Sequence, residues 1–449
     1  MNAHRTSLNI FAALLAATWC ASASAADPPP VWELWPYHVQ VVAAIDDSPL
    51  LPPRLKEQLP ALLHSRIAAI ERGTWKLEVT AAPADLRQEI LAGIDAMTQE
   101  SLPATASDLD KVILLAVAAD DGGVHIRARE LDVITGLWNA TVTIDSRQAD
   151  YVPHAAVRAV LTAFAPLGRI ETSDGQTATL RMRASGLAPH GDRPLAGEAA
   201  FRPVLVECDA KGAVVRGKGE LIDWTYLTAT NASGGIVECR VQTALAGEVI
   251  PEYHPLRQRW ALGVSRSTAP TKVRLVSRES DAPPLEGIEV LAEDKAGDRP
   301  IPIGSSDRRG EVLIPPGPST VRTIVVRQGD EVLARLPLVP GLTSELTLPV
   351  SYDRRLIELE AVLAQLADDL IDAAARRAVL AARLAAAEAA GHSDAVATLK
   401  QQLTAAASVE TFLSRLDRLQ QSVQSASPAT RRRLEPKLTE LRKGIDQLR

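Results

Sequence analysis

The chain of 449 residues is poor in the residue types that usually carry chemistry: it has three cysteines, eight histidines and only 4% aromatic residues. The histidines are scattered, with no H-E-x-x-H segment and no His/Cys cluster, so the sequence contains no zinc-site motif. It also has no G-x-S-x-G segment and no cysteine in a nucleophile signature. We therefore expect no metal, no cofactor and no catalytic residue, and we predict that the protein is not an enzyme.

The sequence also has no large excess of either positive or negative charge. The formal net charge is −6 at pH 7, and charged residues make up 23% of the chain. Because nucleic-acid-binding proteins usually carry a basic stripe, we expect no nucleic-acid partner. Hydrophobic residues make up 46%, which is typical of folded protein. The length predicts two to four domains, since single cores rarely grow beyond about 250–300 residues.

Long hydrophobic runs are missing after the N-terminal segment, so we expect no transmembrane helix in the mature chain. Residues 1–25 are different: Arg5 precedes an apolar run that ends at Trp19, and two overlapping A-x-A sites end at Ala25. This pattern is typical of a secretory signal peptide, cut after Ala25. A membrane anchor is the alternative, which the short run disfavours, and the bulky Trp19 disfavours lipidation of Cys20. We therefore predict an exported protein in the periplasm or at the cell surface.

Only two cysteines, Cys208 and Cys239, follow the predicted cleavage site, and each ends a Val-Glu-Cys tripeptide in a strand-like segment. An oxidising compartment would allow them to pair. Closing that loop would stabilise the protein by up to about 4 kcal/mol in the chain-entropy model. We expect this disulfide; the alternative is two buried thiols on strands that never meet.

Residues 31–170 alternate between strand-like and helix-like segments, which predicts an α/β domain with one mixed sheet. Helical spacing of leucine and isoleucine is clear within 52–73 and 84–97. Segment 110–131 has the pattern of two strands around an Asp-Gly-Gly turn. In its order of elements, this domain resembles envelope α/β domains of the TolB N-terminal and curli-secretion type.

Residues of about 171–195 have the pattern of a polar, turn-rich connection that includes at most one strand. Residues 195–268 consist of short strand-like runs separated by turn residues, which predicts a β domain. Residues 270–350 contain LEGIEV (285–290), GSSD (304–307) and an apolar-Pro-Pro-Gly run (314–317). These segments resemble the carboxypeptidase regulatory-like module. The resemblance implies a small transthyretin- or immunoglobulin-like β-sandwich that serves packing, spacing or adhesion.

The last part of the chain, 352–449, has the heptad spacing of helices that pack along one apolar seam. Gly391 interrupts the helical pattern, and the Ser427-Pro428 pair is typical of a helix start. We expect a coiled-coil hairpin or a three-helix bundle that binds a protein partner or self-associates. The leucines of the first seam are Leu356, Leu359, Leu363, Leu366 and Leu370.

The segment HIRAREL places His125, Arg127 and Arg129 on one face of a strand. Such a face could bind an anion, for example a wall polymer that carries phosphate or carboxylate groups. The alternative is an ordinary solvated sheet face.

The segment KGAVVRGKGE matches the first three fixed positions of a nucleotide-binding P-loop, with Gly212, Gly217 and Lys218. In a P-loop, a serine or threonine follows the lysine and holds Mg²⁺, but here that position is Gly219. The sequence on both sides of the segment has a strand-like pattern. We therefore predict a β-hairpin here.

The layout as a whole resembles exported multidomain proteins of planctomycete-type bacteria, in segments 128–132, 224–227, 333–341 and the helical tail from Tyr352. The sequence predicts a multidomain α+β protein. Its expected role is that of a non-enzymatic cell-envelope protein for scaffolding, adhesion or partner docking. The alternative is a wall-polymer-binding protein or hydrolase that uses the N-terminal α/β domain.

Overall fold

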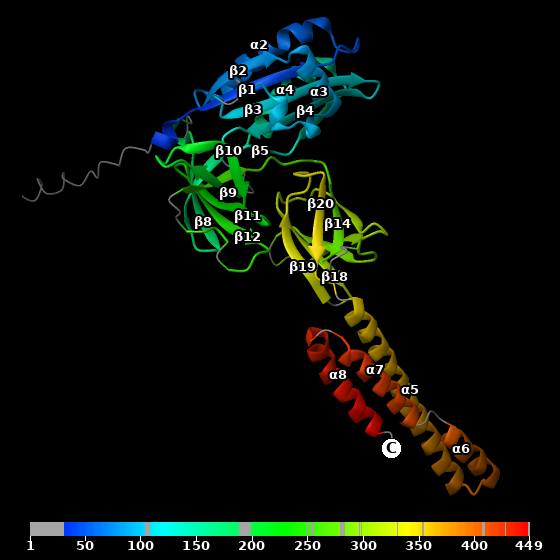
Figure 1. Cartoon of the computed structure of the whole chain (residues 1–449). Coiled ribbons are helices and arrows are strands. Elements are labelled where there is room, and N and C mark those ends of the chain that lie inside the picture. The colour runs from blue at the N-terminus through cyan, green and yellow to red at the C-terminus, as the bar shows by residue number, and fades with distance from the viewer. Residues whose placement is uncertain are drawn as a thin grey trace, which may run out of the picture. The chain divides into compact units, whose positions relative to one another are not determined.

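The computed structural model describes residues 31–449 except 104–107, 188–198, 248, 253–255, 279–282, 296, 298, 330, 353, 406–408, 427 and 448–449. The predicted signal peptide, 1–25, lies outside the described residues. The chain divides after Val350 into two compact units (Figure 1). Within the described part of the chain, no helix combines the length and hydropathy needed to cross a membrane.

The first domain is built on a six-stranded mixed sheet with the order β2-β1-β3-β4-β5, and β6 also pairs with β4. β2, β1 and β3 run parallel, whereas β4 is antiparallel to β3, β5 and β6. This arrangement confirms the prediction that strands and helices alternate in the N-terminal region. The strands are β1 (Tyr37–Ile45), β2 (Trp75–Ala81), β3 (Lys111–Asp120), β4 (Gly123–Asp132), β5 (Leu137–Trp138) and β6 (Val142–Ser146).

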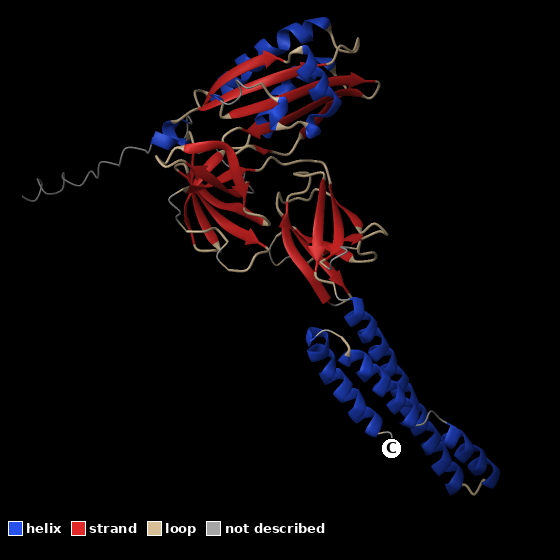
Figure 2. Cartoon of the chain, viewed as in Figure 1, coloured by secondary structure: helices blue, strands red, loops and turns tan. Residues whose placement is uncertain are grey.

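Helices cover both faces of this sheet, as Figure 2 shows. Helices α2 (Pro53–Glu71) and α4 (Val152–Ala163) share one core with alternate residues of β1, β3 and β4. Helix α3 (Ala84–Gly93) packs on the opposite face, against Val42 and Leu114. Because both faces are covered, β1 and β3 are buried along nearly their whole length and consist mainly of apolar residues.

The second domain is a closed antiparallel barrel. β9 pairs with β11 near its start and with β10 further along, while its other edge pairs with β13. The ring β9-β11-β12-β8-β7-β13 is therefore complete, and β10 extends from it. The strands are β7 (Leu167–Ser173), β8 (Thr177–Met182), β9 (Ala200–Cys208), β10 (Val214–Leu221), β11 (Thr225–Ser233), β12 (Ile236–Thr243) and β13 (Arg257–Gly263).

β7 and β8 fall largely within 171–195, where the sequence pattern predicted a polar connection. The pattern allowed for one strand there, whereas the structure has the end of β7 and the whole of β8, both strands of the barrel. Only alternate residues of these strands, such as Ala178 and Leu180, face the apolar interior. The polar residues between them face outward, and they give the segment the composition of a loop.

Two further sheets form a sandwich-like third part, with the orders β17-β14-β20 and β16-β15-β18-β19. Asp307 accepts backbone hydrogen bonds from Arg309 and Glu311, and Gly310 has a φ of +75°. These residues form a tight turn that joins β16 to β17, strands of different sheets. The strands are β14 (Thr271–Ser277), β15 (Glu289–Glu293), β16 (Ile301–Ser305), β17 (Glu311–Ile314), β18 (Arg322–Gln328), β19 (Glu331–Leu338) and β20 (Glu345–Val350).

The second unit is a region of four helices: α5 (Arg354–Ala389), α6 (Ser393–Ala405), α7 (Val409–Gln424) and α8 (Pro428–Asp446). The predicted leucine seam of α5 is buried against α7 and α8. The sequence pattern predicted a single second helix, whereas the structure has α6 and α7 there. The described residues also include short 3-10 helices: η1 (Val31–Leu34), η2 (Ile94–Ala96), η3 (Gln99–Ser101), η5 (Ala149–Tyr151) and η6 (Ser185–Leu187).

Candidate functional site

The predicted face of β4 does carry His125, Arg127 and Arg129 on one side, and the residues between them face the core as expected. His125 lies between two carboxylates, 2.7 Å from Asp145 and 3.1 Å from Asp120. Hydrogen bonds to these two carboxylates raise the pKa of His125 above its ordinary value.

The side chains of the two arginines on this face extend to helix α3 and the residues that follow it. Arg127 donates to the carbonyl of Leu91 at 3.3 Å. Arg129 donates to the carbonyls of Ile94 and Asp95 at 3.1 and 2.8 Å, where α3 ends. A cation at the end of a helix satisfies carbonyls that have no partner inside the helix. Anion binding to this face stays a prediction, and these contacts leave less of each guanidinium available for it.

A buried charge cluster that the sequence pattern did not indicate lies at the ends of β3 and β4. The Nζ atom of Lys111 is 2.9 Å from Glu130 Oε1 and 2.7 Å from Asp132 Oδ2, and all three side chains are 0% exposed. Burial alone would lower the pKa of Lys111, but Asp132 and Glu130 together raise it above its ordinary value. Burial raises the pKa of Glu130 to about 7. Since no solvent reaches the cluster, we interpret it as structural.

The P-loop-like segment contains the turn and the second strand, β10, of a hairpin with β9, as predicted, and Gly217 and Gly219 contact the α/β domain. The backbone N–H groups of Gly217 and Gly219 donate to the carbonyls of Ile134 and Thr135 at 2.9 and 2.8 Å. Arg216, from the same strand, lies 3.1 Å from Asp110 of the α/β domain. The segment therefore binds another part of the chain instead of a nucleotide.

The predicted disulfide is not formed, because Cys208 and Cys239 are both free and buried. Cys208 ends β9, whereas Cys239 lies on β12 opposite Ala229 of β11. β11 separates the two strands, and neighbouring strands are about 4.8 Å apart, so the two Cα atoms exceed the roughly 7 Å limit for a bridge. Burial also raises the pKa of Cys239 to about 12, which makes its thiol unreactive.

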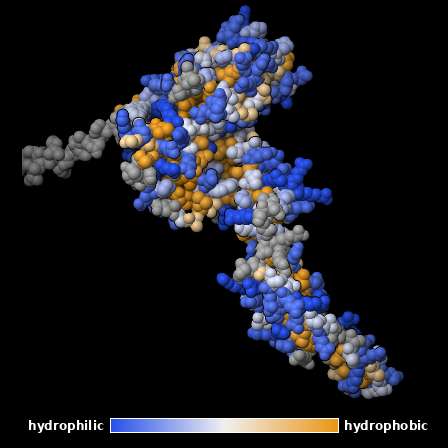
Figure 3. Space-filling view, in the orientation of Figure 1, coloured by the Kyte–Doolittle hydropathy of each residue, from blue (hydrophilic) through white to orange (hydrophobic). Residues whose placement is uncertain are grey.

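A groove of about 940 Å³ lies in the helical unit, and we call it the α5 groove. It is lined by α5 between Asp369 and Arg383, by Gln402 of α6, and by Phe412 and Arg415 of α7. Figure 3 shows hydrophobic surface interspersed with hydrophilic surface on this unit. Within the described residues, no group of three or more His, Cys, Asp or Glu side chains could hold a metal ion.

The α5 groove begins where α8 stops. A Cβ atom on Gly444, near the end of α8, would lie 3.1 Å from Leu370 of α5. Beyond Leu370, the described part of α5 packs against α6 (Figure 1). Among the described residues, α5 therefore lies beside α7 and α8 up to Leu370 and beside α6 beyond it.

Comparison with known proteins finds weak structural similarity and no matching family. No protein-family model matches the chain, and no curated protein matches it. The structure is similar to TolB from Acinetobacter baumannii, at 10% identity and a TM-score of 0.18, over 70% of this chain and 95% of that one. It is also similar to BcpA, the major pilin subunit of Bacillus cereus, at 10% identity and a TM-score of 0.14, over 55% and 71%. Scores this low carry no argument about fold or function.

Proposed function

We propose that the protein is an exported, non-enzymatic cell-envelope protein that docks a partner through the α5 groove. The observation that carries this proposal is the α5 groove itself, about 940 Å³ in volume and lined by side chains of α5, α6 and α7. Val379 in this groove is 52% exposed, and apolar side chains on a helix surface are stabilised when another helix covers them. Export is supported by the leader pattern of residues 1–25.

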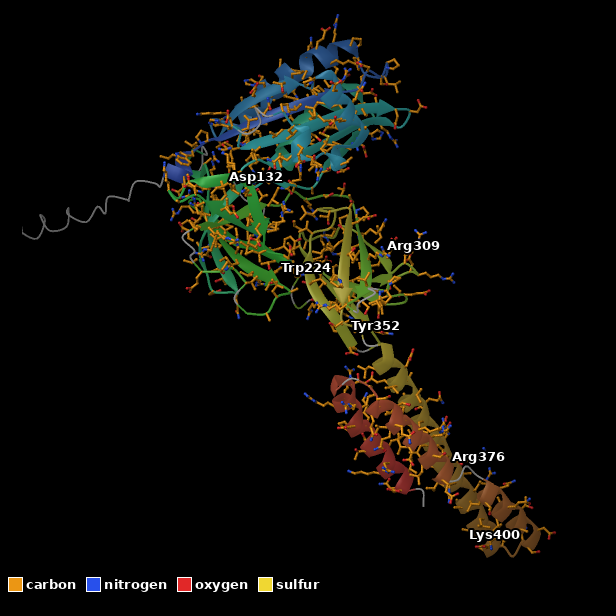
Figure 4. The ribbon with its side chains drawn as sticks, in the orientation of Figure 1. Asp132, Trp224, Arg309, Tyr352, Arg376 and Lys400 are labelled. Carbon is orange, nitrogen blue, oxygen red and sulfur yellow. The ribbon has the colours of Figure 1, made fainter. Side chains whose placement is uncertain are left out.

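The charges at the groove favour an acidic amphipathic helix as the occupant. Arg376, labelled in Figure 4, and Arg383 line the groove together with Asp372. With Arg415 and Asp369, the lining has three cations and two anions, a net charge of +1. Neither arginine has an ion-pair partner within the described residues, whereas Arg415 is paired with Asp369 at 2.7 Å. Cationic groove edges attract a helix whose flanking residues are acidic and repel a basic one.

The alternative function, a wall-polymer-binding domain or hydrolase in the N-terminal region, has less support. Its candidate cations, Arg127 and Arg129, donate to carbonyls at the end of α3. We therefore retain docking as the proposed function.

A photo-crosslinking experiment on the full chain in its native host tests the proposal. A photoreactive amino acid replaces Val379 in the groove, or Val362 as the control, which is 54% exposed on the same helix outside the groove. We expect crosslinks from position 379 to an acidic, helix-forming segment of another protein, and a loss of these crosslinks when Arg376 and Arg383 are both changed to glutamate.

Equal crosslinking from both positions would contradict the proposal, as would crosslinks from position 379 to a second copy of this chain or to a basic segment. The same preparation tests export, because mass spectrometry of the purified protein is expected to find its N-terminus at Ala26. An intact leader on the folded protein would contradict cleavage after Ala25 and favour the membrane-anchor alternative.

A further inference from the structure

A second, smaller cavity lies where the barrel meets the sandwich. Its volume is about 140 Å³. The barrel contributes residues 221–226, which include the turn between β10 and β11, and the sandwich contributes the segment from the end of β19 to the start of β20. Trp224 of this turn is labelled in Figure 4. Most of the lining side chains are apolar, among them Leu221, Trp224, Leu338 and Leu346.

Arg202 of β9 also lines this cavity, although only 7% of the residue is exposed. Its Nη2 atom donates to the carbonyl of Trp138 at 3.0 Å. Its Nε atom is buried, and within the described residues it has no hydrogen-bond acceptor. An arginine has five N–H donors, so most of the donors of this buried cation have no protein acceptor in the described part of the chain.

No carboxylate in the described residues pairs with Arg202. Tyr226, which also lines the cavity, and the buried carboxylates of Asp132 and Glu130 contribute to its electrostatic environment. Both carboxylates lie against Lys111, at 2.7 and 2.9 Å. Asp223 also lines the cavity, but it is exposed and forms no ion pair with Arg202 there. A buried guanidinium with free donors is costly unless an anion joins it.

The volume of the cavity and the side chains that line it restrict which anion can bind there. A planar carboxylate matches the fork of a guanidinium and can accept two of its N–H groups. The apolar lining favours a ligand whose remaining atoms are hydrocarbon. A cavity of about 150 Å³ accommodates one benzene molecule, so the space here suits a body of about six carbon atoms.

We propose that this cavity binds a small carboxylic acid with a short apolar chain, whose carboxylate pairs with Arg202. This site is independent of the α5 groove, because it lies in the other compact unit. Ligand binding here would join the barrel to the sandwich, since residues of both line the cavity.

Calorimetric titration of the full-length mature protein tests the proposal with three probes: 4-methylpentanoate, its neutral amide 4-methylpentanamide, and inorganic phosphate. We expect saturable one-to-one binding of the acid, at least tenfold weaker binding of the amide, and no binding of phosphate. Equal binding of acid and amide, or the lack of saturable binding by the acid, would overturn the proposal.

Two variants locate the site. Arg202→Met is expected to weaken acid binding at least tenfold; because it also removes the hydrogen bond to Trp138, its fold is checked by circular dichroism. Thr343→Trp blocks the cavity from an exposed position and leaves Arg202 in place, so it is expected to abolish binding. Thr347→Trp, at an exposed position of β20 four residues further along and outside the cavity, is the matched control. Wild-type binding by Thr343→Trp would show that the acid binds elsewhere and would refute the site.

Discussion

Lys111, Glu130 and Asp132 form a fully buried charge cluster, and two of its side chains also bond the segment that follows α4. The Nζ atom of Lys111 also donates to the carbonyl of Ala165 at 2.5 Å, and Ala165 N–H donates to Glu130 Oε2 at 2.7 Å. The cluster therefore ties the end of α4 to the sheet. Removing one partner from a buried ion pair usually costs more than the pair contributes, because it leaves an uncompensated charge.

The pKa of Glu130 gives the cluster a predictable pH dependence. Its folded-state pKa is about 7, against 4.5 for the free side chain, so the folded protein binds this proton more tightly than the unfolded chain does. The stability from this group is fully present below about pH 4.5 and is lost as the pH rises through about 7. We expect the free energy of unfolding to fall by about 1–3 kcal/mol across this window.

Urea unfolding between pH 4.5 and 8, on the wild type and on Glu130→Gln, measures this effect. The glutamine has no ionisable proton, so the variant is expected to lack the decline that the wild type shows. Glu238→Gln, which changes an exposed glutamate of β12, is the control and should retain the decline. A decline of equal size in Glu130→Gln would show that another group titrates.

Sequence patterns could not indicate this cluster, because a charged residue at the end of a strand usually lies in solvent. The burial of Lys111 depends on its register opposite Asp132 and on α4 covering that edge. Both are long-range features. The hydrogen bonds of Arg127 and Arg129 escaped prediction for the same reason, since α3 lies far from β4 in the sequence.

At the scale of elements, the α5 seam provides a direct comparison between a buried and an exposed position. Leu366 is 2% exposed in the core of the helical unit, whereas Val362 on the same helix is 54% exposed. Leu366→Ala is expected to destabilise this unit by about 2–5 kcal/mol, because it leaves a cavity. Val362→Ala should change stability by about 0.5 kcal/mol or less.

Hydrogen exchange of the α5 amides, residues 354–389, in the full chain measures this difference locally. Faster exchange along α5 is expected in Leu366→Ala only. Equal exchange in both variants would mean that the seam does not stabilise the unit.

The elements that the sequence predicted well are those with local patterns. Helix α2 buries Leu55, Leu59, Leu63 and Ile67 at four-residue spacing, as its sequence indicates. The cysteine pairing failed because the order of strands in a barrel is not a local property. Cys208 and Cys239 each lie on a strand, as predicted, but β11 lies between β9 and β12.

At the scale of the whole molecule, the described residues up to Val350 form one compact unit, although they contain four sheets. Asp110 of the α/β domain joins it to the barrel, because its carboxylate lies 2.6 Å from Arg183 and 3.1 Å from Arg216. Arg266, beyond the last barrel strand, donates to the carbonyls of Gly317 and Pro318 in the sandwich. We infer that these parts unfold together, since each contact is lost when either partner unfolds.

At Gly219, the contact between the barrel and the α/β domain leaves no room for a side chain. A Cβ atom there would lie 2.7 Å from the carbonyl oxygen of Thr135 and 2.9 Å from Val204. Gly219→Ala must therefore push β10 away from the α/β domain, and we expect a loss of about 1–3 kcal/mol in the free energy of urea unfolding. The backbone of Gly219 is not in the left-handed region, so the penalty comes from contact alone.

Gly93→Ala is the matched control, because its φ of −173° is extended backbone and its nearest neighbour, Ala96 Cβ, lies 3.8 Å away. Its stability should equal or slightly exceed that of the wild type.

If the parts before Val350 unfold as one unit, Gly219→Ala shifts the whole transition, including signals from the sandwich. A shift confined to the α/β domain and the barrel would instead mean that the sandwich unfolds independently, because the strain at Gly219 reaches it only through the barrel.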